Sequence, residues 1–189
     1  SRGLGDVYKR QEHTRHNVGF EIIDALARRN RISVERSKCK AIVGEGIIGG
    51  QRAVLCKPQT YMNLSGESVV QLCNWYKPEY DQLIVLFDDC DLPEGKVRFR
   101  AEGSAGTHNG MRNIVKELNT EQFARVRIGT KTDELANHEV ELIDFVLSKV
   151  DFANKQVLQQ SIDTAVEAFE MIIEGDDIQR IQERVNRKK

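Results

Sequence analysis

The sequence predicts an α/β fold, because segments with strand patterns alternate along the chain with segments that have helical periodicity. A second observation is the continuous apolar run LIVLF at residues 83–87, which polar residues flank. Such a run is typical of a strand buried on both faces of a mixed or parallel sheet. The third is a length of 189 residues without an internal repeat or a low-complexity linker, which indicates one domain.

The first elements are a helix and a pair of strands. Residues 17–29 carry apolar side chains at three- and four-residue spacing and end in basic residues, which predicts a helix. Residues 39–44 and 51–57 are short apolar segments separated by glycines. We therefore expect two strands that turn through Gly49 and Gly50.

A loop over residues 61–64 and a helix that Ser65 caps and that ends near Tyr76 should follow. The strand at 83–87 comes next and leads into the acidic sequence DDCD. Seven further elements are expected, namely an edge strand, a glycine-rich loop, a helix, a strand and three C-terminal helices. In that order, they cover residues 96–100, 103–110, 111–118, 125–129, 138–148, 153–173 and 176–187.

Composition and charge narrow the function. The formal net charge is −1, so any contact with RNA must be a local basic patch rather than bulk attraction. The apolar runs are too short to cross a bilayer, and no apolar secretory segment opens the chain. Four cysteines lack the spacing of a metal knuckle and are expected to be core thiols, which favours a cytoplasmic protein: Cys39, Cys56, Cys73 and Cys90.

The first 11 residues, SRGLGDVYKRQ, differ from the rest of the chain. They have no strand-like apolar run, and three basic residues precede any structured pattern. We expect residues 1–11 to be a non-native or atypical leader, and residues 12–189 to form the single domain.

Two His-Asn pairs stand at the entrances of predicted helices. His16 and Asn17 precede the first helix, where a lone histidine is more often a cap or a surface residue than a catalytic group. His108 and Asn109 lie in the segment GSAGTHNG, whose small residues let a substrate approach the backbone. Together the two pairs suggest a shared pocket.

Asp88 follows the buried strand, at the sheet edge where ligand sites gather in α/β proteins. Its carboxylate could orient an imidazole and stabilise the protonated ring. Two alternatives stay open: a divalent cation site with Asp89 and Asp91, or a solvated turn, which the spacing alone favours. Asn63 could donate to a carbonyl oxygen beside an apolar wall formed by Met62, or it could cap the second helix.

Several catalytic classes are excluded. GSAGTHNG lacks the lysine and the Ser or Thr of a nucleotide-binding loop, and it does not match the dinucleotide fingerprint. No serine lies in a GxSxG elbow, and no cysteine has the surroundings of a nucleophile. Water activated by a histidine is the simplest remaining chemistry.

Four motifs resemble those of the bacterial peptidyl-tRNA hydrolase family in their order and spacing. They are TRHNVGF at 14–20, KPQTYMNLSGESV at 57–69, DDCDLPEGKVRFR at 88–100 and GSAGTHNGMRNI at 103–114. The family's opening hydrophobic strand and its glycine, asparagine, proline, glycine turn have no counterpart in residues 1–11. The resemblance implies a single α/β domain with a mixed, twisted sheet flanked by helices.

The resemblance also implies an enzyme that hydrolyses the ester between peptide and tRNA in peptidyl-tRNA and releases free tRNA. His16 would be the general base, and Asp88 would hold its imidazole in the basic form. The residues expected at the substrate are Tyr61, Met62, Asn63, His108 and Asn109, with Arg100 and Arg127 at the tRNA phosphates. Family members generally act as monomers without a metal or a cofactor. The alternative is a non-enzymatic RNA-binding relative of the same fold.

Overall fold

A computed structural model describes residues 17–137 and 152–186 of the protein. Its strands are β1 (Arg36–Lys38), β2 (Ala41–Ile48), β3 (Gln51–Pro58), β4 (Ile84–Pro93), β5 (Val97–Arg100) and β6 (Ala124–Lys131). Its α-helices are α2 (Val18–Asn30), α3 (Ser65–Tyr76), α4 (Asn109–Leu118), α5 (Asp133–Ala136), α7 (Phe152–Glu174) and α8 (Ile178–Asn186). Two short 3-10 helices, η2 (Met62–Leu64) and η3 (Tyr80–Gln82), complete the described elements.

The described strands form two three-stranded sheets. In the first, β2 lies between β1 and β3, and all neighbours are antiparallel. In the second, β6 lies between β4 and β5, parallel to β4 and antiparallel to β5. The predicted α/β class is confirmed, and the second sheet is mixed, as the family resemblance implies. Within the described part of the chain, β3 and β4 each have one edge without a neighbouring strand.

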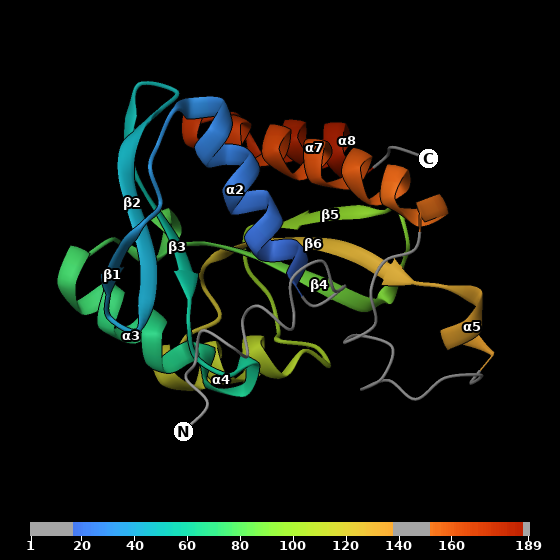
Figure 1. Cartoon of the computed structure of the whole chain (residues 1–189), viewed down its shortest axis with the longest axis horizontal. Coiled ribbons are helices and arrows are strands. Elements are labelled where there is room, and N and C mark those ends of the chain that lie inside the picture. The colour runs from blue at the N-terminus through green and yellow to red at the C-terminus, as the bar shows by residue number, and fades with distance from the viewer. Residues whose placement is uncertain (1–16, 138–151, 187–189) are drawn as a thin grey trace.

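Helices cover both faces of the mixed sheet, as Figure 1 shows: α2, α7 and α8 lie on one side, and α3 and α4 lie on the other. The side chains of β4 alternate accordingly, because a strand points successive residues to opposite faces. Ile84 and Leu86 pack with the first group of helices, and Val85 and Phe87 pack with the second. Apolar packing on both faces is therefore confirmed, but the strand continues through DDCD to Pro93.

The predicted hairpin of β2 and β3 is confirmed. Ile48 pairs with Gln51, so the turn consists of Gly49 and Gly50. Their φ angles are 56° and 77°. Two successive positive φ angles are typical of a type I′ turn, which matches the twist of the strands and which glycine adopts without steric cost.

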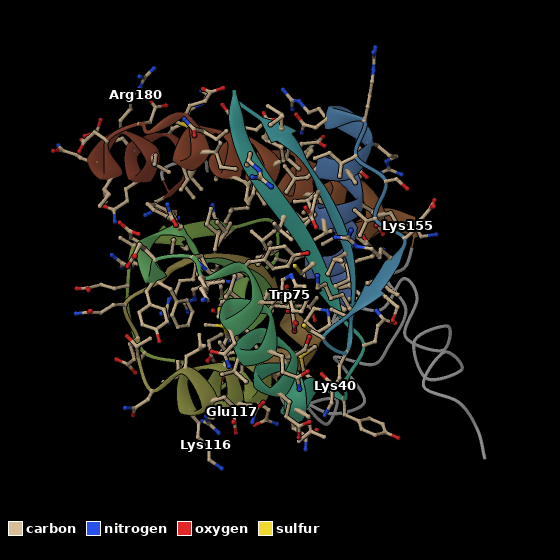
Figure 2. All side chains as sticks on the ribbon, turned by 90° about the vertical axis from the view of Figure 1, so that its left-hand side faces the viewer. Lys40, Trp75, Lys116, Glu117, Lys155 and Arg180 are labelled. Atoms are coloured by element: carbon tan, nitrogen blue, oxygen red, sulfur yellow. The ribbon has the colours of Figure 1, made fainter. Side chains whose placement is uncertain are left out.

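The sequence pattern does not predict β1, which turns into β2 through Cys39 and Lys40. Both turn residues have a positive φ although neither is glycine, so tertiary contacts with α3 must compensate. Ser68 Oγ donates to the Cys39 carbonyl oxygen at 2.7 Å, and Lys40 Nζ lies 2.7 Å from the Glu67 carboxylate. Figure 2 looks onto the side of the molecule that is on the left in Figure 1, and it labels Lys40 and the exposed Trp75 of α3.

The other predicted helices and strands are also found, with one correction at α3. Ser65 is the first residue of α3 and not its cap, because η2 replaces the predicted loop and runs directly into the helix. The Ser65 hydroxyl therefore donates backwards, to the Met62 carbonyl oxygen at 2.8 Å. The helix predicted at residues 138–148 lies outside the described residues. None of the described helices is long and apolar enough to cross a membrane.

The four cysteines are free thiols and are half-buried. Cys39, Cys56 and Cys73 pack against the apolar clusters, as expected of core thiols. Cys39, Cys56 and Tyr76 pack around a small apolar cluster that contains Leu72. Burial, together with the neighbouring Cys73 and Cys39, raises the pKa of the Cys56 thiol to about 12. A thiol with this pKa is a poor nucleophile, which agrees with the absence of a nucleophilic cysteine motif.

Gly19 allows α2 to lie directly against β4. A Cβ atom at this position would come within 2.4 Å of the Leu86 carbonyl oxygen, which belongs to the sheet backbone. We expect Gly19→Ala to lower the free energy of unfolding by about 1–3 kcal/mol, because overpacking forces backbone shifts. Urea denaturation measures the change, and the exposed Arg28→Ala in the same helix should stay within about 0.5 kcal/mol of wild type. Equal stability of the two variants would contradict this packing.

Candidate active site

A cavity of about 1020 Å³ lies along β3 and β4, each of which is one of the two edge strands of its described sheet. Helices α2, α3, α4 and α7 provide further apolar walls, with Phe20 and Leu72 among the lining side chains. Because residues 84–86 line this cavity, they are only half-buried despite their apolar character. The lining becomes polar where β4 reaches Asp88.

Asp88 and His108 form the buried polar pair of this cavity. His108 Nε2 lies 3.2 Å from Asp88 Oδ1, and the two side chains are 10% and 3% exposed. Asp88 belongs to β4, and the regular parallel pairing with β6 ends one residue later, at Asp89 opposite Gly129. DDCD is therefore a strand segment, and the alternative of a solvated turn is wrong.

His108 takes its position from the start of α4. It is the N-cap residue of this helix, and its Nδ1 accepts a hydrogen bond from the Met111 backbone N–H at 3.1 Å. Free N–H groups at a helix N-terminus need acceptors, so this bond satisfies the helix and orients the ring. The Phe87 ring packs against the imidazole, with 5.0 Å between centroids.

Only some of the predicted substrate residues line this cavity. Tyr61 and Met62 line the same cavity as Asp88 and His108. Asn63 and Asn109 are exposed and are not among the lining residues of the cavity. They stand on η2 and at the first position of α4, two elements that touch each other. Both amides thus lie where they could meet a substrate that approaches from outside.

The position of His16 falls outside the described residues. Its neighbour Asn17 is described, is buried, and lines the cavity together with Asp88.

The other carboxylates of DDCD have partners of their own. Asp89 is buried and pairs with Arg127 Nε, and its Oδ1 accepts from the Asp91 backbone N–H at 2.9 Å. Asp91 accepts from the Thr107 hydroxyl at 2.7 Å. Across the described ranges, no three His, Cys, Asp or Glu side chains are arranged to hold a metal ion. The arrangement therefore does not support the alternative of a divalent cation at Asp88, Asp89 and Asp91.

The two arginines expected at tRNA phosphates differ in their surroundings. Arg100, at the end of the edge strand β5, is exposed, and its guanidinium has no partner among the residues that the structure describes. Arg127 is one-third exposed and is paired with the buried Asp89. Arg100 is thus free to bind a phosphate, whereas Arg127 already neutralises a carboxylate.

Arg125 is an anchor of the site that sequence reasoning missed. It is buried, and its guanidinium donates to the carbonyl oxygens of Ser104 and Glu121 at 2.8 Å and 2.9 Å. Burial lowers the pKa of this guanidinium. The bond to Ser104 ties β6 to the glycine-rich loop, and this loop delivers His108. An arginine within an apolar strand was the available signal, because such a residue needs buried partners.

Because Arg127 is paired with Asp89 and Arg100 is not, we expect replacing Arg127 to destabilise the protein more than replacing Arg100. Arg127→Ala would leave the Asp89 carboxylate buried with fewer donors, so the free energy of unfolding should fall by about 1–3 kcal/mol. Arg100→Ala should change it by less than about 0.5 kcal/mol. Urea denaturation tests both, and adding Asp89→Asn to Arg127→Ala should restore part of the loss. Equal effects of the two single substitutions would refute the structural role of Arg127.

Comparisons with known proteins agree on one family. The family model described as Peptidyl-tRNA hydrolase matches residues 2–189. The peptidyl-tRNA hydrolase of Alkaliphilus oremlandii is 43% identical over 171 residues, which are 90% of this chain and 90% of that protein. That of Desulforamulus reducens is 45% identical over 174 residues, or 92% of this chain and 82% of that protein. The crystal structure of peptidyl-tRNA hydrolase from Acinetobacter baumannii, 29% identical, superposes with a TM-score of 0.84 and covers 95% of this chain and 90% of that one. The chain therefore belongs to the peptidyl-tRNA hydrolase family.

Proposed function

We propose that this chain hydrolyses the ester bond between peptide and tRNA in peptidyl-tRNA, with His16 as the general base. Membership of the family supports the reaction. The observation that carries the assignment to this site is the buried Asp88–His108 pair in the cavity that Asn17 also lines. A buried carboxylate and imidazole in a cavity are typical of a site that moves protons.

The reaction proceeds by direct attack of water. His16 removes a proton from a water molecule while the water oxygen attacks the carbonyl carbon of the ester. The exposed amides of Asn63 and Asn109 are suited to donate to the developing oxyanion. The carbon–oxygen bond to the ribose then breaks, and the ribose oxygen takes the proton from His16. The tRNA leaves with a free hydroxyl, and the peptide leaves as a carboxylic acid that releases its remaining proton to solvent as it ionises.

Asp88 supports this reaction by its charge. A carboxylate beside an imidazole favours the protonated ring that forms when the base accepts a proton, and it fixes the orientation of the ring. His16 directly precedes Asn17 in the sequence, and Asn17 and Asp88 line one cavity, which supports the proposal that Asp88 serves His16. Tyr61 and Met62 in the same lining offer an apolar wall to the peptide.

Binding of the tRNA part is assigned to local positive charge. Arg100 is exposed and can bind a phosphate, while Arg127 contributes chiefly by neutralising Asp89. Because the net charge of the chain is only −1, electrostatic attraction of tRNA must come from such a local group of basic side chains. We further propose that the protein acts in the cytoplasm as a monomer, with no metal or cofactor in the reaction.

The proposed base predicts a large loss of activity in His16→Ala. Release of an N-blocked peptide from tRNA should slow by about 10²–10⁴-fold, the usual contribution of a general base. His13→Ala, three residues upstream, is the matched control and should keep the wild-type rate. If His16→Ala and His13→Ala hydrolyse at one rate, the assignment of the base is wrong.

The same assay separates the alternatives. A non-enzymatic RNA-binding relative would bind peptidyl-tRNA without releasing peptide from it, in wild type and variant alike. A metal-dependent hydrolase would lose turnover in the presence of a chelator, whereas hydrolysis by His16 should be insensitive to chelation.

A further inference from the structure

We propose that His108 is a positioning residue, whose neutral ring donates from Nε2 to Asp88 and is fixed in this tautomer by the N-cap of α4. This inference rests on the proposed function, because it assigns His108 a role in the hydrolysis at Asp88. It differs from a role as a second base or as part of the substrate wall.

The hydrogen bond to the helix decides the tautomer. The Met111 backbone N–H can only donate, so His108 Nδ1, 3.1 Å away, must accept with its lone pair. A neutral imidazole carries one proton, which is therefore on Nε2. Nε2 lies 3.2 Å from Asp88 Oδ1, and a carboxylate is the acceptor that this N–H requires.

The surroundings hold the ring in this orientation. Phe87 packs against the imidazole at an interplanar angle of 55°. Gly110 leaves the necessary space, since a Cβ atom there would lie 2.9 Å from His108 Cε1 and 2.8 Å from Met62 Sδ. The side chain of His108 is 10% exposed, so water competes little for its ring nitrogens.

These contacts make His108 a hydrogen-bond donor to Asp88 and do not suit it to accept a proton as a base would. A second proton on the ring would have to replace the bond from Met111, and a lone pair on Nε2 would face the Asp88 carboxylate. His108 therefore remains neutral and directs one N–H at Asp88. It links the first turn of α4 to the orientation of the carboxylate that serves the reaction.

Two substitutions separate the two hydrogen bonds of the ring. In His108→Asn, the side-chain oxygen can still cap α4 as Nδ1 does, but the shorter amide does not reach Asp88. In His108→Gln, the terminal amide nitrogen can replace Nε2 as the donor to Asp88, while the cap is lost. Melting temperature and the kinetics of peptide release are measured for both variants and for wild type.

If His108 acts through Asp88, activity should depend on the N–H donor to Asp88, and stability should depend on the acceptor that caps α4. We expect His108→Asn to keep its melting temperature and lose kcat on the order of tenfold or more with little change in KM. His108→Gln should retain kcat within about threefold and melt at a lower temperature. Full kcat in His108→Asn, with reduced kcat in His108→Gln, would show that only the helix cap matters and would overturn the proposal.

A readout without substrate tests the tautomer itself. In ¹⁵N-labelled protein at the pH of the assay, the ring of His108 should show a protonated Nε2 and an unprotonated Nδ1. A doubly protonated ring, or a proton on Nδ1 alone, would overturn the proposal whatever the kinetics. Failure of the proposed function would instead appear as wild-type protein that has the expected tautomer and releases no peptide.

Discussion

The burial of the Asp88 carboxylate is the constraint on which the site depends. A buried charge is costly unless hydrogen bonds replace the lost water, and Asp88 is almost inaccessible at the end of the regular part of β4. The ring of His108 meets this requirement from another element. For this contact to form, α4 must begin at the right place, and residue 110 must lack a side chain. One buried carboxylate thereby fixes the geometry of a helix start.

The neighbouring acidic residues follow the same rule with different partners. Asp89 is neutralised by Arg127 of β6, and Asp91 accepts from Thr107 of the glycine-rich loop. Arg125 anchors that loop from its other side, through Ser104. The contacts of Asp91 with Thr107 and of Arg125 with Ser104 thus attach an irregular loop to the rigid sheet. This is how a glycine-rich segment can present His108 with a defined orientation.

Periodicity and turn chemistry were sufficient to predict most of the fold. The α2 helix, the hairpin through Gly49 and the packing of residues 83–87 on both faces follow from local patterns. The β1 strand could not be predicted, because its turn at Cys39 depends on contacts with a helix far along the chain. Within the site, the motifs identified His108 and Asp88 separately. Their contact across 20 residues depends on tertiary structure, as does the burial of Arg125.

The motifs contain two histidines that could act as the base, and the contacts of one of them, His108, bear on this choice. Both ring nitrogens of His108 are engaged, one by the Met111 amide and one toward Asp88. A base needs a lone pair that faces the water it activates, and His108 has no such lone pair to offer without breaking the start of α4. The contacts of His108 therefore do not favour it as the base. The other His-Asn motif, which precedes α2 in the sequence, offers a second imidazole, and this is consistent with the proposal that His16 is the base.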